Sequence, residues 1–292
     1  MSSLRTALSL CKTGAYDLEV FLDVAPPPPA GHPGFIAFWD MQRGLHARGG
    51  AISLTTNGGR TFRVVLRTRR VSGMQAFGRR SAIVDLDNGN ALRSLDGGRS
   101  WTRFRHRFDA DFATTQVGLG YRAGVFEFVK GLVSTRDGGK SWQPLASPCT
   151  RFTSFSAGVE LVTPEVGWIV CAGQPSAGQQ RKAVFRTTNR GRTWRPTTGQ
   201  LSWSGYVWGG AFARDGFGLV WEARGTLYVT RDGGARWTPK TQLAMPELDF
   251  GGGAAAFSAG RGLVLLSRGN RSERLFATHN FGHSWRLVHR WP

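Results

Sequence analysis

Hydrophobic and polar residues alternate in short runs along most of the chain, and Gly, Asn or Asp separates one run from the next. Alternation with a period of two is typical of strands with one buried face, and the intervening residues are typical of turns. The run Ala51–Leu54, for example, is followed by a turn-like phrase and then by a second run, Phe62–Arg67. The pattern predicts an all-β protein built from hairpins.

One eight-residue phrase, Thr/Ser-x-Asp/Asn-x-Gly-x-x-Trp/Phe, recurs along the chain. We call its copies the box turns; they span residues 55–62, 94–101, 135–142, 187–194, 230–237 and 278–285. The Asp/Asn positions are separated by 39, 41, 52, 43 and 48 residues. Such steps fit the four-stranded blades of a propeller and are too long for ankyrin or leucine-rich repeats.

The chemistry of the phrase predicts a structural hairpin turn. Asp or Asn accepts hydrogen bonds from main-chain N–H groups, the Ser/Thr hydroxyl adds another bond, and Gly supplies positive φ. The terminal aromatic residue then anchors the corner in the apolar interior. We therefore assign structural roles to Asn57, Phe62, Asp96, Trp101, Asp137, Trp142, Asn189, Trp194, Asp232, Trp237, Asn280 and Trp285.

This phrase resembles the Asp-box, or BNR, repeat, which marks the turn between the third and fourth strands of propeller blades. The resemblance implies an all-β propeller over nearly the whole chain. The chain departs from the pattern at Asn57, Asn189 and Asn280, and where Phe62 replaces Trp. Because Asn keeps an acceptor oxygen, we expect these changes to weaken single turns only.

A second motif precedes the box turns and reads as strand, tight turn, strand; four copies align on Gly44, Gly167, Gly218 and Gly262. With the box turns it predicts one propeller domain over residues 1–292. The expected blades span residues 34–67, 72–108, 111–147, 150–198, 203–241 and 247–292.

The N-terminal segment aligns with the first box turn without a gap, so that Ala7–Leu22 matches Ala51–Leu66. We interpret residues 7–24 as strands three and four of a partial seventh blade that has lost its Asp and Trp; an unrelated extension is the alternative. If the repeat is real, its first two strands are absent, which a start codon placed too far downstream would explain.

The charge balance points to an anionic partner. The chain has 292 residues with 38 Lys+Arg against 19 Asp+Glu, a net charge of +19. A genome rich in G and C favours arginine but does not remove carboxylates. No apolar run reaches the roughly 20 residues of a membrane-spanning helix. Nucleic acid is a disfavoured partner, because box anchors and blade cores account for most aromatic residues and leave no stacking platform.

Recognition is expected on one side of the ring. The turns between strands 1 and 2 and the box turns share the box face, whereas the loops between strands 2 and 3, and between blades, share the opposite side, the loop face. The loop face carries the variable loops, where recognition is common, and a solvated, arginine-rich surface is the alternative interpretation. Its candidate partner-binding residues are Arg67, Arg69, Arg70, Arg151, Arg181, Lys182, Arg268, Arg271 and Arg274.

Catalysis is the alternative to binding. The six histidines and three cysteines lack metal-ligand spacing, and we expect neither a metal nor another cofactor. Sialidases share the box repeat and use a Tyr nucleophile with Glu, Asp and three arginines. Tyr206 and Glu222 fall in one blade, but the carboxylates Asp40, Glu127, Glu160 and Asp249 show no pairing in sequence. A sialidase-like glycoside hydrolase is therefore the alternative function.

In repeat style the chain is more similar to the photosystem II assembly and stability factor family and its bacterial relatives. That resemblance implies a non-enzymatic propeller that holds a protein partner with an arginine-rich patch; its individual arginines do not map onto this sequence. We expect a binding or assembly module for an anionic protein or glycan, with the oligomeric state left open.

The cellular compartment that we expect for the protein depends on whether two of its cysteines form a disulfide. Residues 1–12 are too short and too polar for a signal peptide, which favours the cytoplasm. Cys149 and Cys171 lie in one blade at positions that can meet, and a disulfide would fit an exported protein. Two separate buried thiols are the alternative. We expect an extracytoplasmic or cell-envelope protein.

Overall fold

A computed structural model describes residues 34–68, 71–87, 90–104, 108–121, 131–152, 155–222, 226–241, 250–268 and 272–292. The chain divides into two compact units, Met1–Gly31 and His32–Pro292, and all of the described residues belong to the second. The expected partial blade at residues 7–24 lies outside the described residues.

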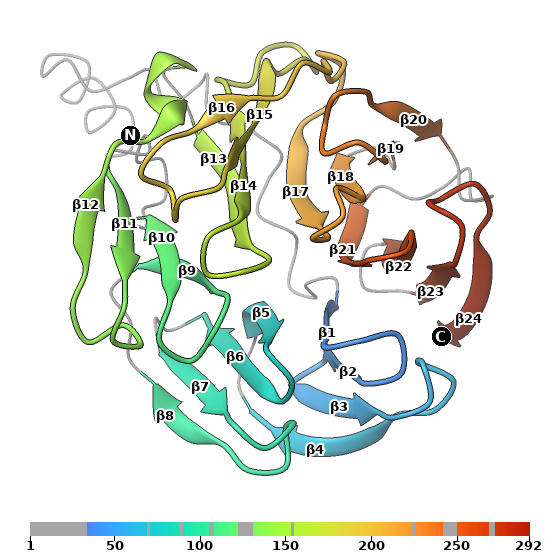
Figure 1. Ribbon diagram of the computed structural model, residues 1–292. Coiled ribbons are helices and arrows are strands. Elements are labelled where there is room, and N and C mark those ends of the chain that lie inside the picture. The colour runs from blue at the N-terminus through green and yellow to red at the C-terminus, as the bar shows by residue number, and fades with distance from the viewer. Residues whose placement is uncertain are drawn as a thin grey trace, which may run out of the picture. The chain divides into compact units, whose positions relative to one another are not determined.

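The second unit consists of six antiparallel sheets of four strands, each made from consecutive strands (Figure 1). Blades 1 to 3 contain β1 (Phe35–Phe38), β2 (Gly44–Arg48), β3 (Ala51–Thr55) and β4 (Arg63–Arg67); β5 (Val71–Phe77), β6 (Ser81–Leu86), β7 (Ala91–Ser94) and β8 (Thr102–Phe104); and β9 (Asp109–Phe112), β10 (Gly118–Tyr121), β11 (Leu132–Thr135) and β12 (Gln143–Leu145).

A short 3₁₀ helix, η2 (Pro148–Phe152), leads into the second half of the ring. Blades 4 to 6 contain β13 (Phe155–Leu161), β14 (Gly167–Ala172), β15 (Lys182–Thr187) and β16 (Arg195–Pro196); β17 (Val207–Phe212), β18 (Gly218–Glu222), β19 (Thr226–Thr230) and β20 (Thr238–Thr241); and β21 (Phe250–Phe257), β22 (Arg261–Arg268), β23 (Ser272–Thr278) and β24 (Arg286–Trp291).

The ring closes with six blades. The first strand of each blade lies innermost and contacts the first strand of the next, and β21 of blade 6 contacts β1 of blade 1. Among the described residues there is no seventh sheet. The structure is therefore an all-β, six-bladed propeller of four-stranded antiparallel blades.

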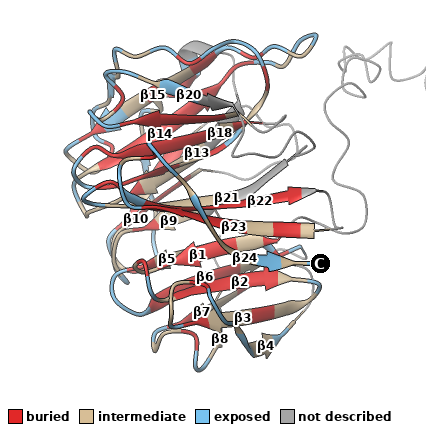
Figure 2. Cartoon of the chain, turned by 90° about the vertical axis from the view of Figure 1, so that its right-hand side faces the viewer, coloured by how far each residue is buried: buried red, intermediate tan, exposed pale blue. Residues whose placement is uncertain are grey.

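Apolar packing holds the blades together. Six clusters of buried apolar side chains lie one at each junction between neighbouring blades. At the closing junction, for example, Leu263 and Leu265 of blade 6 belong to one cluster with Ile36 of blade 1. Outer strands such as β4 and β8 are largely exposed, as Figure 2 shows for one side of the molecule.

The box turns have the predicted hydrogen-bonded geometry. In the third copy, Thr135 Oγ1 donates to Asp137 Oδ1 at 2.8 Å and accepts from the Gly139 N–H at 2.9 Å. Asp137 Oδ1 also accepts from the Ser141 N–H at 2.9 Å. These bonds satisfy the polar groups of the corner internally.

Asn preserves the hydrogen-bond network of these turns. Asp137 Oδ2 accepts from the Ser141 hydroxyl at 2.5 Å, whereas Asn189 Nδ2 donates to the Thr193 hydroxyl at 2.8 Å. Because a hydroxyl can donate or accept, either side chain completes the same network. Asn57 and Asn280 make the equivalent bonds to Thr61 and Ser284.

The box turns also join each blade to the blade before it. The terminal aromatics pack against the junction clusters, as Trp101 does beside the blade 1 residue Leu45. Gly98, with φ +81°, lies so close to this leucine that a Cβ there would be 3.1 Å from Leu45 Cδ2. This glycine therefore serves both the turn and the close approach of two blades.

Candidate functional site

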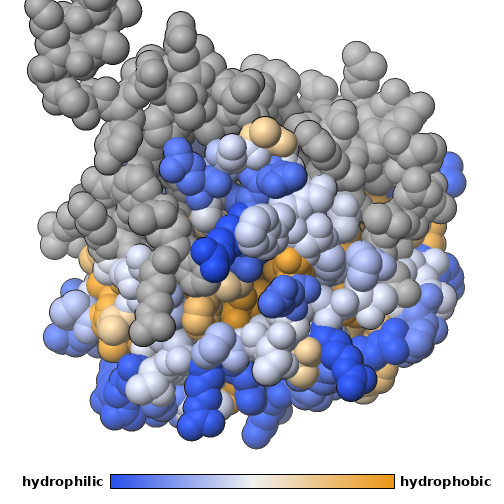
Figure 3. Space-filling view, turned by 90° about the horizontal axis from the view of Figure 1, so that it is seen from above, coloured by the Kyte–Doolittle hydropathy of each residue, from blue (hydrophilic) through white to orange (hydrophobic). Residues whose placement is uncertain are grey.

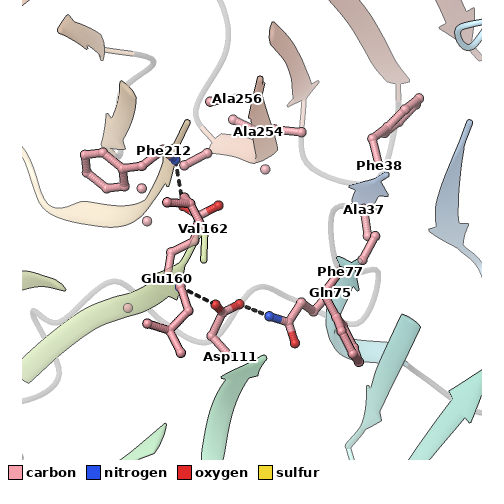
Figure 4. A pocket seen from close by; sticks show the side chains of 18 of the residues that line it. Ala37, Phe38, Gln75, Phe77, Asp111, Glu160, Val162, Phe212, Ala254 and Ala256 are labelled. Carbon is pink, nitrogen blue, oxygen red and sulfur yellow. Dashed lines mark hydrogen bonds between the residues drawn. The ribbon is translucent and has the colours of Figure 1, made fainter. Parts of the chain in front are cut away.

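The centre of the ring contains a cavity of about 750 Å³, lined by residues from the first strands of all six blades. Figure 4 shows labelled side chains from several blades around this space. Such a volume falls within the range of small-molecule sites. The cavity is the natural starting point for a functional site.

One register position of the first strands differs between the two halves of the ring. Its residues are Ala37, Gln75, Asp111, Glu160, Ala211 and Ala255 in blades 1 to 6, opposite Leu45, Ile83, Leu119, Trp168, Leu219 and Leu263 of the second strands. Blades 2 to 4 thus carry polar side chains where blades 5, 6 and 1 carry alanine. We call Gln75, Asp111 and Glu160 the polar wall.

Each residue of the polar wall bonds to the next blade. Gln75 Nε2 donates to Asp111 Oδ1, Asp111 Oδ2 accepts from the Leu161 N–H at 2.5 Å, and Glu160 Oε2 accepts from the Phe212 N–H at 2.7 Å. Figure 4 shows these contacts on one side of the cavity. The three bonds link blades 2, 3, 4 and 5 in series.

The protein environment favours the protonated forms of both carboxyl groups. Burial raises the pKa of Asp111 to about 7, although the Leu161 N–H opposes this shift. Burial, and then the nearby charge of Asp111, raise the pKa of Glu160 well above its ordinary value. Near neutral pH this wall can therefore both donate and accept hydrogen bonds.

Apart from Lys182, the loop-face candidates fall into three groups. Arg69, Arg70 and Arg271 lie outside the described residues, and only the backbone of Arg151 and Arg268 is described. Arg67 and Arg181 are exposed, and Arg274 is half-buried on β23. Figure 3 shows one side of the molecule, where hydrophilic side chains cover much of the described surface. The box turns carry further exposed cations: Arg60, Arg99, Arg136, Lys140, Arg192, Arg231 and Arg236.

Lys182 does not belong to the exposed surface that we expected. It begins β15, and its Nζ lies 2.5 Å from Glu222 Oε1 in the neighbouring blade. The same atom donates to the carbonyls of Ser202 and Ser204 at 2.8 and 2.7 Å. Burial lowers the pKa of Lys182 and raises that of Glu222. Lys182 is thus a buried support for the connection between blades 4 and 5.

The closing junction uses a buried pair in the same way. Glu273 lies five residues before its box threonine, as Lys182 does, and it reaches into the next blade. Its Oε2 lies 2.7 Å from His46 Nε2, and its Oε1 accepts from the Gly34 N–H at 2.5 Å. Polar contacts therefore fix the junction where the first and last blades meet.

The residues considered for sialidase chemistry do not form a nucleophile pair. The Tyr206 hydroxyl accepts the Gly178 N–H at 3.1 Å, and Glu222 is held by Lys182. Cys149 and Cys171 form a disulfide, with their Cα atoms 5.3 Å apart. Within the described residues there is no cluster of three potential metal ligands. No helix in the described part is long and apolar enough to cross a membrane.

The polar wall was missed in the sequence. In the sequence Glu160 is one of several scattered carboxylates and nothing pairs it with Asp111, because the proximity of the two depends on the register of two separate blades. The sequence does contain a signal. If the first strands are aligned on the residue that pairs with the second-strand Gly or Ala, the residues just before it are Gln75, Asp111 and Glu160 in blades 2 to 4. The sequence alone did not fix that alignment in the degenerate blades 2 and 3.

Comparisons with known proteins support the fold. No protein-family model and no curated protein matches the chain. Among solved structures, YCF48 bound to a D1 peptide is 18% identical over 89% of this chain and 82% of its own, with a TM-score of 0.51. The Aleuria aurantia lectin AAL is 13% identical over 89% and 96%, with a TM-score of 0.58. The GH74 xyloglucanase from Xanthomonas campestris is 16% identical over 87% and 47%, with a TM-score of 0.53. At these identities the likeness concerns the propeller fold.

Proposed function

We propose that this protein is a non-catalytic binding or assembly propeller that recognises an anionic partner, a protein or a glycan, through the arginine-rich loop face. The observation that carries the proposal is that carboxylates and arginines have different surroundings. Most described carboxylates accept hydrogen bonds or form ion pairs within the protein, many arginines stand on its surface, and Lys and Arg outnumber Asp and Glu by 38 to 19. The surface potential is then set by cations, which attract anionic partners.

The carboxylates have identifiable structural partners. Three aspartates hold box turns, others accept hydrogen bonds between blades or within turns, and others form ion pairs. Together these carboxylates are Asp40, Asp96, Asp111, Asp137, Glu160, Glu165, Asp215, Glu222, Asp232 and Glu273. Arginine suits anions because its guanidinium group makes bidentate bonds to carboxylate, phosphate or sulfate.

Propellers of similar architecture hold both classes of partner. YCF48 is described bound to a D1 peptide, and the Aleuria lectin in complex with Fucα1-6GlcNAc. These likenesses support a binding role through the fold, and they leave the choice between protein and glycan open. Arg67 and Arg181 are the exposed described cations of the proposed face.

A matched pair of triple variants tests the face. Retention on immobilised heparin and on an immobilised poly-glutamate peptide is measured for the natural chain, for Arg268→Ser/Arg271→Ser/Arg274→Ser, and for Arg99→Ser/Arg192→Ser/Arg236→Ser on the box face. Both variants lose three charges, so a difference between them reports location and not net charge. We expect the loop-face variant to elute at lower NaCl than the box-face variant. Equal elution would contradict the face, and no retention of the natural chain would contradict an anionic partner.

Glycoside hydrolysis of the sialidase type remains the second candidate. The observation that favours it is the pair of carboxyl groups with raised pKa values, Asp111 and Glu160, on the wall of the cavity. A general acid needs a raised pKa. The test is a panel of fluorogenic sialosides and glycosides with the natural chain and with Asp111→Asn. Turnover that this variant abolishes would replace the binding proposal.

We also propose an extracytoplasmic or cell-envelope location. The support is the Cys149–Cys171 disulfide, since such bonds persist in oxidising compartments. Alkylation of free thiols in cells lysed directly into denaturant, which exposes the buried Cys149 and Cys171, followed by mass spectrometry, tests this. Unmodified cysteines that react only after reduction are expected, and labelling of both thiols without reduction would contradict it.

A further inference from the structure

The half of the cavity nearer the loop face has a lining of its own, distinct from the polar wall. On the second strands, three residues after the aligned Gly or Ala, blades 2, 3 and 5 carry Asp85, Tyr121 and Trp221. All three line the cavity. The equivalent residues Ala47, Val170 and Leu265 belong to the apolar core.

Glycines on the first strands make room for two of these side chains. A Cβ at Gly73 would lie 3.2 Å from Asp85 Oδ2, and a Cβ at Gly209 would lie 2.4 Å from Trp221 Cζ2. Each side chain therefore lies over a glycine of the inner strand, where a larger residue would displace it. Blades 2 and 5 stand opposite each other in a ring of six, so Asp85 and Trp221 line the cavity from opposite sides.

A second tryptophan stands beside this position. The pairing of β17 with β18 shifts between Val207 and Gly209, which makes Trp208 a bulge residue. The bulge of blade 2 carries Ser72 at the same place. Trp208 lines the cavity and is 40% exposed. A large apolar side chain kept accessible on a rigid strand is typical of a binding surface.

The wall on the other half adds hydrogen-bonding capacity. Glu160 Oε2 is held by the Phe212 N–H, and no bond from a described residue reaches its Oε1. The cavity therefore combines aromatic faces on blade 5 with carboxyl groups on blades 2, 3 and 4. Small-molecule sites are usually lined by apolar side chains with a small number of polar groups among them.

We propose that the cavity binds a neutral sugar ring, stacked on Trp221 and Trp208 with its hydroxyl groups bonded to Asp85 and Glu160. A pyranose presents a face of C–H groups that suits an aromatic ring and a rim of hydroxyls that suits carboxyl groups. Burial favours the neutral forms of Asp111 and Glu160, so the polar wall offers a ligand hydrogen bonds and little charge. The net charge of +19 repels a cation. The site lies inside the ring and is independent of the proposed loop-face function.

Calorimetric titration with methyl pyranosides of glucose, galactose, mannose and fucose tests the proposal. At least one should bind with a Kd on the order of 1 mM. Sorbitol, which has hydroxyls but no ring, should not bind. Trp221→Ala should weaken binding roughly 3- to 10-fold, the amount expected for one aromatic contact. Because the ligand is neutral, added NaCl should leave the Kd unchanged, unlike retention on heparin.

Trp203 provides the matched control. It is 60% exposed and does not line the cavity, so Trp203→Ala should leave sugar binding unchanged. Trp221 also packs against the core, so Trp221→Phe and Asp85→Asn are included as gentler variants, each checked for an unchanged thermal midpoint. No heat with any pyranoside at about 20 mM, equal binding of sorbitol, or equal binding by the cavity variants and Trp203→Ala would each overturn the proposal.

Discussion

The two halves of the ring use one register position in opposite ways. Blades 2 to 4 place Gln75, Asp111 and Glu160 there, and each bonds to the next blade; blades 5, 6 and 1 place alanine there. Yet every junction has its own apolar cluster. Ring closure therefore does not depend on polar residues at this position, and their presence on one side gives the cavity a polar wall.

The largest effect on stability is expected when a carboxylate is placed at this register position in a blade that carries alanine there. Ala211 is buried, at 3% exposure. Ala211→Asp should lower the free energy of unfolding by about 2 to 4 kcal/mol, because it buries a charge in apolar surroundings. Urea denaturation measures this. A cost below about 0.5 kcal/mol would show that the two halves are interchangeable.

Removing one link of the polar wall should cost less. Asp111→Ala leaves the Leu161 N–H without its acceptor and leaves the Gln75 amide only its longer bond, 3.3 Å, to the Phe112 carbonyl. We expect the free energy of unfolding to fall by about 1 to 3 kcal/mol, the usual cost of unmet polar groups. Ala37→Gly at the same register position is the matched control for a change in an apolar blade. A smaller loss for Asp111→Ala than for this control would contradict a linking role.

The polar wall should also make stability depend on pH. The pKa of Asp111 is raised from 3.8 to about 7, so the folded state favours the protonated acid. Its contribution is complete below the unfolded pKa and is lost as the pH rises through about 7. Between these values the thermal midpoint should fall with rising pH, and Asp111→Asn should reduce that slope. An identical slope in the variant would show that Asp111 does not titrate there.

The smallest effect is expected at the box turns, which are alike in both halves. Asn already occupies three of them and completes the same network. Asp137→Asn should therefore shift the thermal midpoint by less than about 2 °C, while Asp137→Ala should lower it by about 2 to 4 °C, since no acceptor remains. Differential scanning calorimetry compares the two. Equal losses would mean that the acceptor oxygen is not what stabilises the turn.

The sequence allowed the ring to be predicted because its corners are local. A box turn needs only eight consecutive residues, and its aromatic terminus marks a blade wherever it occurs. The polar wall is a contact between blades, so it depends on registers that the degenerate blades 2 and 3 obscured. Lys182 was misjudged for the same reason: its partner Glu222 lies in the next blade, and neither residue is close to the other in sequence.

The difference between contacts within one blade and contacts between blades also explains why the disulfide was easier to predict than the cavity. Cys149 and Cys171 lie in one blade, so their pairing was within reach of the sequence as one of two alternatives. Trp221 and Asp85 line one cavity from opposite sides only because the ring closes and because Gly73 and Gly209 leave space above the inner strands. Glycines in a strand of known register are the signal that would have pointed to them.

The most direct test of the account is sugar binding by a chain whose polar wall has been made apolar throughout. Gln75→Ala/Asp111→Ala/Glu160→Ala should still unfold in a single cooperative transition, because the six apolar clusters remain. Its titration with the methyl pyranoside that binds the natural chain should show at least a roughly tenfold weaker affinity. A folded variant that binds this pyranoside as tightly as the natural chain would contradict the claim that the polar wall serves a ligand.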